Sequence, residues 1–206
     1  MPLFTLLSDD DLAVLVDDLQ LKKYGRDQFI FQQGDTSRRL YVIVKGKVRI
    51  FKSSPGGHET SINIFSTRDV IGEFATIDNQ PRSATAKAIS RCDLLEIDSR
   101  TFLTHFRQMP DLALGLARTL ATKVRWTAAF AETVAQYDAA GRLLHTLLLY
   151  KDQLGDEIEP GQRYVLDLSL NQTDLASLIG ARREWVNRLM REWKKRGLIE
   201  YKGGKV

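Results

Sequence analysis

The spacing of apolar side chains divides the chain into a short helix, a run of strands and a return to helices. Ser8 and Asp11, ahead of Leu12 and Leu15, predict a capped amphipathic helix of about three turns. From residue 29 to residue 97 short β-branched or aromatic runs alternate with turn residues. These runs are 41–44, 48–51, 62–65 and 94–97. They predict an antiparallel barrel or roll.

Helical spacing resumes after Arg100 and continues as one long stripe. The stripe consists of Leu116, Leu120, Val124, Thr127, Ala131 and Val134. Such a stripe on a long helix favours packing against a partner helix in a dimer, although it also fits a helix lying along its own roll. The small residues between Asp138 and Gly141 predict a hinge, because the apolar pattern restarts with Leu143. A second domain is expected from there.

The last third of the chain predicts a helix-turn-helix. Residues 153–161 are acidic and loop-like, and 164–168 alternate as a strand. Asn171 can then cap a helix with Asp174 at its third position, and Gly180 supplies the unhindered turn that follows. The apolar faces of the two helices are expected to be Leu175, Leu178 and Ile179, and then Val186, Leu189 and Met190.

This pattern leaves several polar side chains on the outer face of the second helix. Arg183 and Arg188 can donate to guanine, and Glu184 can accept from cytosine, when such a helix enters a major groove. Glu184 and Arg188 could equally form an ordinary ion pair at i, i+4. The basic segment 194–206, broken by Gly197, resembles a short hairpin wing with side chains placed for phosphates.

Composition narrows the function classes. Residues 171–206 carry nine Lys and Arg against four Asp and Glu, which fits a DNA backbone or a solvated helix face. The single cysteine, Cys92, excludes an internal disulfide framework and a cysteine-ligated iron–sulfur cluster, and it fits a reducing cytoplasm. The opening apolar run has no basic flank, and no run reaches the roughly 20 apolar residues that span a bilayer. We therefore expect a cytoplasmic protein that does not contact the membrane.

Metal chemistry is not expected either. A cupin-like enzyme would need a metal held by clustered histidines. His58, His105 and His145 are the only histidines, and they lie far apart in the sequence. We therefore expect no enzyme activity and no metal, haem or iron–sulfur cofactor.

Two motifs together resemble the Crp–Fnr regulators of bacteria, and within them the catabolite activator branch, over essentially the whole chain. One is the helix-turn-helix, whose Arg183, Glu184 and Arg188 match the base-reading residues of the family. The other is 71–85, which resembles the phosphate-binding cassette of cyclic-nucleotide domains. The resemblance implies an α+β fold: an N-terminal cyclic-nucleotide-binding β-roll sensor (1–107), a long dimerisation helix (108–137) and a C-terminal winged helix-turn-helix that binds DNA (138–206).

The resemblance also assigns roles to the cassette. The ligand residues would be Gly72, Glu73, Arg82, Ser83, Ala84 and Thr127. Arg82 would pair with the cyclic phosphate, Ser83 and the next amide would donate to it, and Glu73 would accept from the ribose 2′-hydroxyl. Thr127 matches a threonine that contacts adenine at the dimer interface. Gly72 could instead be only a turn, and Glu73 and Arg82 only an internal ion pair, as in members that have lost the ligand.

The chain departs from the family at a few positions. Ala128 replaces the serine that completes the purine contact from the other subunit, and Lys123 is the basic residue a few positions earlier. Arg182 replaces the usual Ser or Thr cap, and Trp185 stands where a small residue is common. Cyclic AMP or a related nucleotide is therefore the implied effector.

For DNA the resemblance implies a palindromic double-stranded site with a GTG-containing half-site. It also implies a homodimer and RNA polymerase as a partner. The DNA-binding residues would be Asn171, Gln172, Thr173, Arg182, Arg183, Glu184, Asn187, Arg188, Arg191 and Lys202. The alternative is a ligand-independent regulator of the same family with a vestigial nucleotide pocket.

Overall fold

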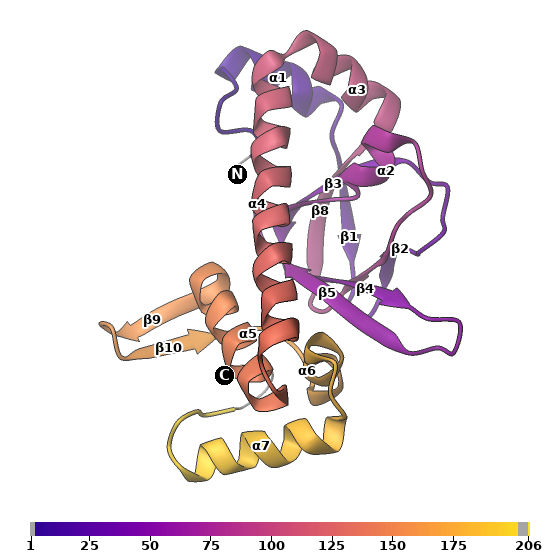
Figure 1. Ribbon diagram of the computed structural model, residues 1–206. Coiled ribbons are helices and arrows are strands. Elements are labelled where there is room, and N and C mark those ends of the chain that lie inside the picture. Colours follow the sequence, from indigo (N-terminus) through magenta and orange to yellow (C-terminus); the bar gives the residue numbers. More distant parts are fainter. Residues whose placement is uncertain (1–2, 202–205) are drawn as a thin grey trace. The chain divides into compact units, whose positions relative to one another are not determined.

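The computed structural model describes residues 3–201 and 206 (Figure 1). The chain forms two compact units. The first contains Met1–His58 and Asn63–Trp126, and the second contains Glu59–Ile62 and Thr127–Val206. The division into three segments at residues 107 and 137 stays a prediction.

The first unit is an antiparallel β-roll of two four-stranded sheets, as the strand pattern predicted. One sheet has the order β1-β8-β3-β6 and the other β2-β7-β4-β5. The strands are β1 (Gln20–Tyr24), β2 (Phe29–Phe31), β3 (Arg39–Lys45), β4 (Val48–Ser53), β5 (Glu59–Phe65), β6 (Val70–Ile71), β7 (Thr85–Ala88) and β8 (Cys92–Asp98). Strand β1 lies outside the predicted strand region, because its sequence Gln-Leu-Lys-Lys-Tyr is largely polar and exposed.

The central strand β3 is buried on both faces, which explains its continuous apolar run. Its alternate side chains Leu40 and Val42 belong to a core shared with the flanking helices. Tyr41 and Ile43 point to the other core, which also contains Phe31 of β2. The period of two along one strand thus supplies both cores of the unit.

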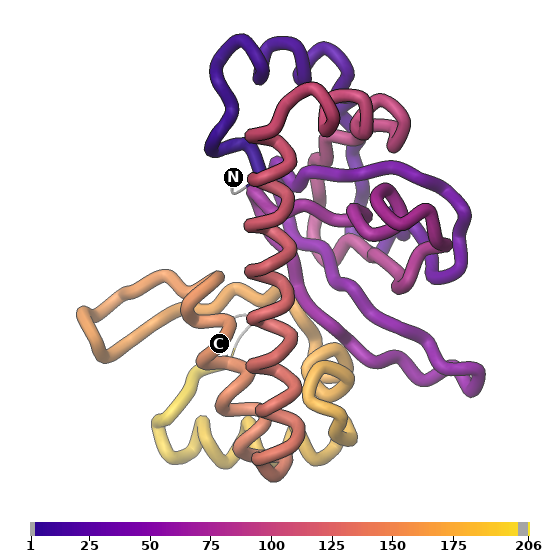
Figure 2. The backbone as a smooth tube through the Cα atoms, turned by 45° about the horizontal axis from the view of Figure 1, so that its top comes forward, coloured from indigo at the N-terminus to yellow at the C-terminus, as the bar shows by residue number. Residues whose placement is uncertain are grey.

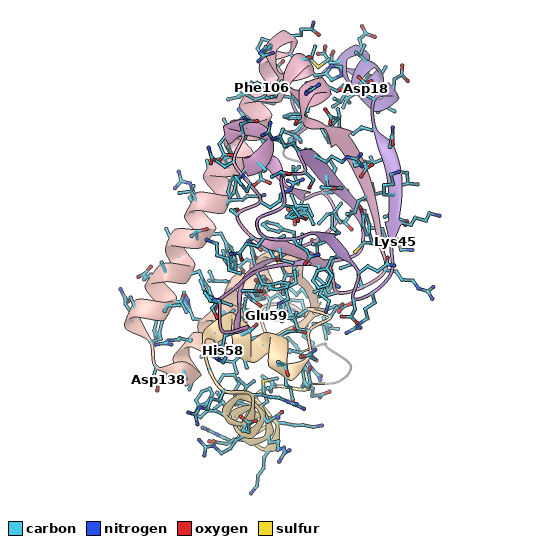
Figure 3. All side chains as sticks on the ribbon, turned by 90° about the vertical axis from the view of Figure 1, so that its right-hand side faces the viewer. Asp18, Lys45, His58, Glu59, Phe106 and Asp138 are labelled. Atoms are coloured by element: carbon cyan, nitrogen blue, oxygen red, sulfur yellow. The ribbon has the colours of Figure 1, made fainter. Side chains whose placement is uncertain are left out.

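Three helices border this roll: α1 (Asp9–Asp17), the short α2 (Glu73–Asp78) and α3 (Ser99–Gln108). The Ser8 hydroxyl accepts from the Asp11 amide at 3.1 Å, which confirms the predicted cap of α1. The helices α1 and α3 meet where His105 Nε2 lies 2.6 Å from Asp18 Oδ2. Figure 3 shows Asp18 and Phe106 near one end of the unit, with Lys45 well away from both.

Helix α4 (Pro110–Gln136) runs without interruption for 27 residues (Figure 2). Of the predicted stripe, Leu116 is buried in the core of the first unit and Leu120 packs against it. Farther along, Val124 is 67% exposed and Val134 is 42% exposed. The stripe therefore begins by packing on its own roll and continues as an exposed apolar face.

The second unit contains α5 (Ala139–Leu154), β9 (Gly155–Glu159), β10 (Arg163–Leu166), α6 (Gln172–Ile179) and α7 (Arg183–Lys195). The predicted hinge is shorter than expected. Only Tyr137 and Asp138 interrupt the helices, and Gly141 lies in the first turn of α5, where its amide donates to the Asp138 carboxylate at 2.8 Å.

The segment predicted as an acidic loop is also different, because α5 and β9 occupy most of it. Strand β9 pairs antiparallel with β10, and the two form a separate hairpin. The acidic side chains of β9 face solvent, so no apolar alternation marked it as a strand.

The predicted wing lies partly outside the described residues. Residues 198–201 form no strand, and 202–205 are not described. Val206 exchanges two backbone hydrogen bonds with Leu166 of β10, at 2.8 and 2.9 Å. Among the described residues, no helix is long and apolar enough to cross a membrane.

Candidate functional site

The predicted cassette brings Gly72, Glu73, Arg82 and Ala84 into one part of the first unit. The backbone of Arg82 is held by the 34–35 turn, since its amide donates to the Asp35 carbonyl at 2.8 Å and its carbonyl accepts from the Gly34 amide at 2.9 Å. Its guanidinium donates from Nη1 to the Gly72 carbonyl at 2.8 Å and from Nη2 to the Arg39 carbonyl at 2.7 Å.

Gly72 is required for this arrangement. Its φ is +83°, a region that residues with a Cβ rarely adopt. A Cβ here would also lie 2.7 Å from Arg82 Nη1 and 2.7 Å from the Arg39 carbonyl oxygen. The glycine therefore permits both the turn into α2 and the close approach of the guanidinium.

The Arg82 side chain is a buried cation with unused hydrogen-bonding capacity. The residue is 3% exposed, and its Nε has no hydrogen-bond partner among the described residues. Burial lowers its pKa from the ordinary value, and nearby Tyr41, Asp35 and Glu73 oppose that shift. No carboxylate in the described part of the chain forms an ion pair with it. The charge is instead held by backbone carbonyls and by an aromatic face, since the guanidinium carbon lies 4.2 Å from the centre of the Phe31 ring.

Glu73 is paired with a different residue from the one suggested by the internal ion-pair alternative. Its carboxylate is buried and accepts from Lys123 Nζ of α4 at 2.7 Å. The same ammonium donates to the Val70 carbonyl at 2.6 Å and lies 4.5 Å from the centre of the Phe65 ring. The proposed Glu73–Arg82 pair is therefore replaced by Glu73–Lys123.

The other predicted ligand residues are placed as follows. Ser83 is exposed and Ala84 is buried, directly after Arg82. Thr127 is exposed on α4 and belongs to the second unit. Their contacts with a nucleotide stay predictions.

In the second unit the helix-turn-helix has the predicted caps. The Asn171 side chain accepts from the amides of Thr173 and Asp174 at 2.8 and 2.9 Å, and the Asp174 carboxylate accepts from the Asn171 amide at 3.1 Å. Gly180 has φ +65°, and its amide donates to the Ala176 carbonyl. Arg182 is the N-cap of α7 without a side-chain cap bond. The turn between α6 and α7 is thus built as the sequence indicated.

The outer face of α7 is polar and largely free. Arg182, Arg183, Glu184, Arg188 and Arg191 are exposed. Within the described residues, Glu184 and Arg188 do not form the ion pair that was the simpler alternative.

The remaining members of the predicted DNA-binding set differ in exposure. Asn187 is half-buried, and so is Leu189, which was expected in the buried face with Val186 and Met190. Asn171 and Thr173 are exposed and Gln172 is half-buried at the start of α6. Lys202 lies outside the described residues.

Sequence reasoning did not identify the aromatic support of Arg82. Phe31 and Tyr41 come from separate strands, and the run 41–44 that contains Tyr41 predicted only a strand. The importance of Lys123 for Glu73 was also not visible, because 50 residues separate the two. Among the described residues, no three His, Cys, Asp or Glu side chains are grouped so that they could hold a metal ion.

Comparison with protein families finds two models along the chain. The cyclic nucleotide-binding domain matches residues 21–109, and the Crp-like helix-turn-helix domain matches residues 141–206. The first model covers the roll and Arg82, and the second covers α5 to the end of the chain.

Individual proteins match over nearly the full length. The CRP-like cAMP-activated global transcriptional regulator of Mycobacterium tuberculosis is 30% identical over 195 residues, 95% of this chain and 86% of the relative. The cyclic AMP receptor protein of Thermus thermophilus is 28% identical over 206 residues, 100% of this chain and 91% of the relative. The solved structure of the c-di-GMP responsive global regulator of Xanthomonas campestris has a TM-score of 0.79 at 21% identity, covering 97% of this chain and 98% of that chain, and shares its fold.

Proposed function

Because this chain belongs to the Crp–Fnr family of transcription regulators, we propose that it is a homodimer that binds a palindromic DNA site under the control of a cyclic nucleotide. RNA polymerase is the further partner of this proposal. The effector is cyclic AMP or a related cyclic nucleotide, bound in the first unit.

The observation that best supports control by a ligand is the buried guanidinium of Arg82. Enclosing a cation without a carboxylate partner costs several kcal/mol, as an order of magnitude, so an anion is the natural complement of this position. Arginine has five N–H donors, and within the described residues two of them donate to backbone carbonyls, those of Gly72 and Arg39. A cyclic phosphodiester supplies one negative charge and acceptor oxygens, which the remaining capacity of Arg82 suits.

The family resemblance assigns further residues to the proposed pocket. Ser83 and the Ala84 amide are placed beside Arg82 in sequence and supply uncharged donors to the phosphate. Glu73 is the acceptor for the ribose 2′-hydroxyl, and Thr127 is the polar group for the base. Gly72 contributes by leaving room for the guanidinium.

The DNA-binding role rests on the exposed face of α7. Arg183 and Arg188 are unpaired cations within the described residues, and Glu184 lies between them on the first turns of the helix. A helix in the major groove reads bases with its N-terminal residues, and each bidentate contact contributes about 1–3 kcal/mol of discrimination. Asn171, Gln172, Thr173, Arg182, Asn187, Arg191 and Lys202 would add phosphate or base contacts around this centre.

Two observations favour the second candidate, a ligand-independent regulator. The Glu73 carboxylate already has a cationic partner, Lys123, and Ala128 lacks the hydroxyl implied by the family resemblance. In this alternative the pocket is vestigial, and only the amount of protein sets activity.

Titration calorimetry separates the two candidates. The purified full chain is titrated with cyclic AMP, cyclic GMP and c-di-GMP, each with and without a duplex containing a GTG palindrome. Ligand control predicts that one nucleotide binds and tightens DNA binding by a given factor, and that DNA tightens nucleotide binding by the same factor. No heat and no change in DNA affinity with any of the three would support the vestigial pocket.

Two variants serve as reciprocal controls. Arg82→Ala should abolish nucleotide binding while DNA binding without nucleotide stays close to that of the parent protein. Arg183→Ala should keep nucleotide binding but weaken binding to the GTG duplex by about 5- to 150-fold, which corresponds to the loss of one bidentate base contact. If Arg183→Ala leaves DNA affinity unchanged, α7 is not the reading element.

A further inference from the structure

A stack of two aromatic rings lies against the Arg82 guanidinium. The guanidinium carbon is 4.2 Å from the centre of the Phe31 ring and 6.0 Å from that of Tyr41. The two rings stack on each other, with centres 5.9 Å apart and planes at 29°. All three side chains are buried: Arg82 is 3% exposed, Tyr41 4% and Phe31 8%. The stack is thus part of the roll interior and not a surface contact.

The two kinds of contact to Arg82 constrain different motions. The carbonyls of Gly72 and Arg39 hold the edge of the guanidinium through Nη1 and Nη2. Those bonds lie in the plane of the group and leave tilting out of that plane weakly restrained. A ring face at 4.2 Å opposes this tilt and attracts the cation through its quadrupole. Because the three side chains are buried, this attraction is stronger than at an exposed position.

We propose that Phe31 is a positioning residue for anion binding: its ring, with Tyr41 beside it, fixes the plane of the Arg82 guanidinium before the ligand arrives. This inference rests on the proposed function, since it concerns the phosphate site of the same pocket. Preorganisation lowers the ordering cost of binding, so the ring contributes to affinity without touching the nucleotide. An aliphatic side chain of similar volume would fill the space but supply neither a flat face nor a quadrupole.

The planar geometry has a second consequence for Arg82 itself. A lysine at this position has a compact ammonium that cannot bond two carbonyls and stack on a ring at the same time. Arg82→Lys would therefore keep the charge and lose the fixed geometry. The arrangement explains why the buried cation is an arginine.

The test compares Phe31→Leu with Phe31→Tyr, which keeps the ring, in titrations of the full chain with cyclic AMP. Phe31→Leu should weaken cyclic AMP binding by about 2- to 30-fold, the range that corresponds to a cation–π contact, whereas Phe31→Tyr should stay within about twofold of the parent protein. Phe31→Met is a second non-aromatic variant if the leucine variant folds poorly. Phe29→Leu is the matched control, because Phe29 lies on the same strand, is 50% exposed and has Lys87 Nζ 5.7 Å from its ring centre. It should not change the affinity.

A second readout reports on the arginine directly and needs no ligand. In ¹⁵N-arginine-labelled protein, the ring current of Phe31 should displace the Arg82 Nε–H proton resonance upfield. That displacement should disappear in Phe31→Leu and persist in Phe31→Tyr and Phe29→Leu. Arg82→Lys assigns the resonance by removing it.

The two readouts together decide the inference. The inference is supported if Phe31→Leu binds cyclic AMP more weakly and its Arg82 Nε–H resonance also moves from the position in the parent protein. Unchanged affinity in Phe31→Leu, or weaker binding with the Arg82 resonance unmoved, overturns it, because the ring would then not act through the arginine. If the parent protein shows no heat with cyclic AMP, cyclic GMP or c-di-GMP while Phe31→Leu still moves the resonance, ligand control fails. The ring then supports a buried charge only, and the assigned role in binding is refuted.

Discussion

In the proposed homodimer, removing one exposed apolar side chain from α4 should weaken the association of the two subunits strongly. Val124 is 67% exposed in the single chain, although it lies in the middle of the largely apolar stripe of α4. Fully burying a valine contributes about 1.5–3 kcal/mol, so covering the exposed part contributes roughly 1–2 kcal/mol for each copy. A twofold interface buries the residue twice, which gives about 2–4 kcal/mol for the dimer.

The variant Val124→Ser tests this estimate with little disturbance of the helix, because valine and serine have similar helix propensities. The expected loss raises the dimer dissociation constant by about 30- to 1000-fold. Sedimentation equilibrium over a range of protein concentrations measures it directly. DNA binding should then depend on protein concentration, because in the proposed dimer each subunit would supply the recognition helix for one half-site.

The matched control is Leu114→Ser. Leu114 lies on the same helix and is 46% exposed, but it falls outside the stripe. Its replacement should leave the dissociation constant unchanged. The reasoning is refuted if Val124→Ser associates like the parent protein, or if Leu114→Ser weakens association equally.

Three further changes test local interactions. Asn171→Ala removes the acceptor for two amides at the start of α6, one of them that of Asp174, and should lower the free energy of unfolding by about 1 kcal/mol in urea titrations; an unchanged midpoint would argue against the cap. Burial raises the pKa of Tyr41 to about 12, whereas an unfolded tyrosine titrates near 10. Between these values the unfolded chain loses a proton that the folded chain retains, so stability should fall as pH rises through this window; Tyr41→Phe should reduce that slope in chemical unfolding followed by circular dichroism, and an identical slope would contradict the assignment. The fully buried hydroxyl of Thr133 donates to a backbone carbonyl at 2.8 Å and therefore accepts from His145 Nδ1 at 2.5 Å. Thr133→Val should cost about 1–3 kcal/mol and Thr133→Ser should recover most of it in thermal unfolding, whereas equal losses in both would show that the hydroxyl is not the important group.

The helix-turn-helix could be predicted almost completely from local sequence. Its cap at Asn171, its turn at Gly180 and the buried side of α6 depend on residues within a few positions of each other. Such interactions act over one helical turn, so their spacing is visible in a single sequence. The exposed side chains of α7 follow from the same period, except that Asn187 and Leu189 are both half-buried.

Some strands were harder to predict from the sequence. Strand β1 is polar and becomes a strand by pairing with β8, whose residues lie about 70 positions later. Strand β9 likewise depends on β10 and carries no apolar alternation of its own. Backbone pairing between distant segments stabilises both, and no side-chain pattern within either segment records it.

The sequence alone was enough to recognise the cassette, because its glycine, acid and arginine stand at characteristic spacings. It also showed the apolar period of the long helices. Only the tertiary structure decided their partners. Glu73 pairs with Lys123 of α4, and Arg82 lies between two carbonyls and the ring of Phe31. Hydrogen bonds and charge pairs depend on distances of a few ångströms between segments far apart in the chain, and folding alone establishes those distances.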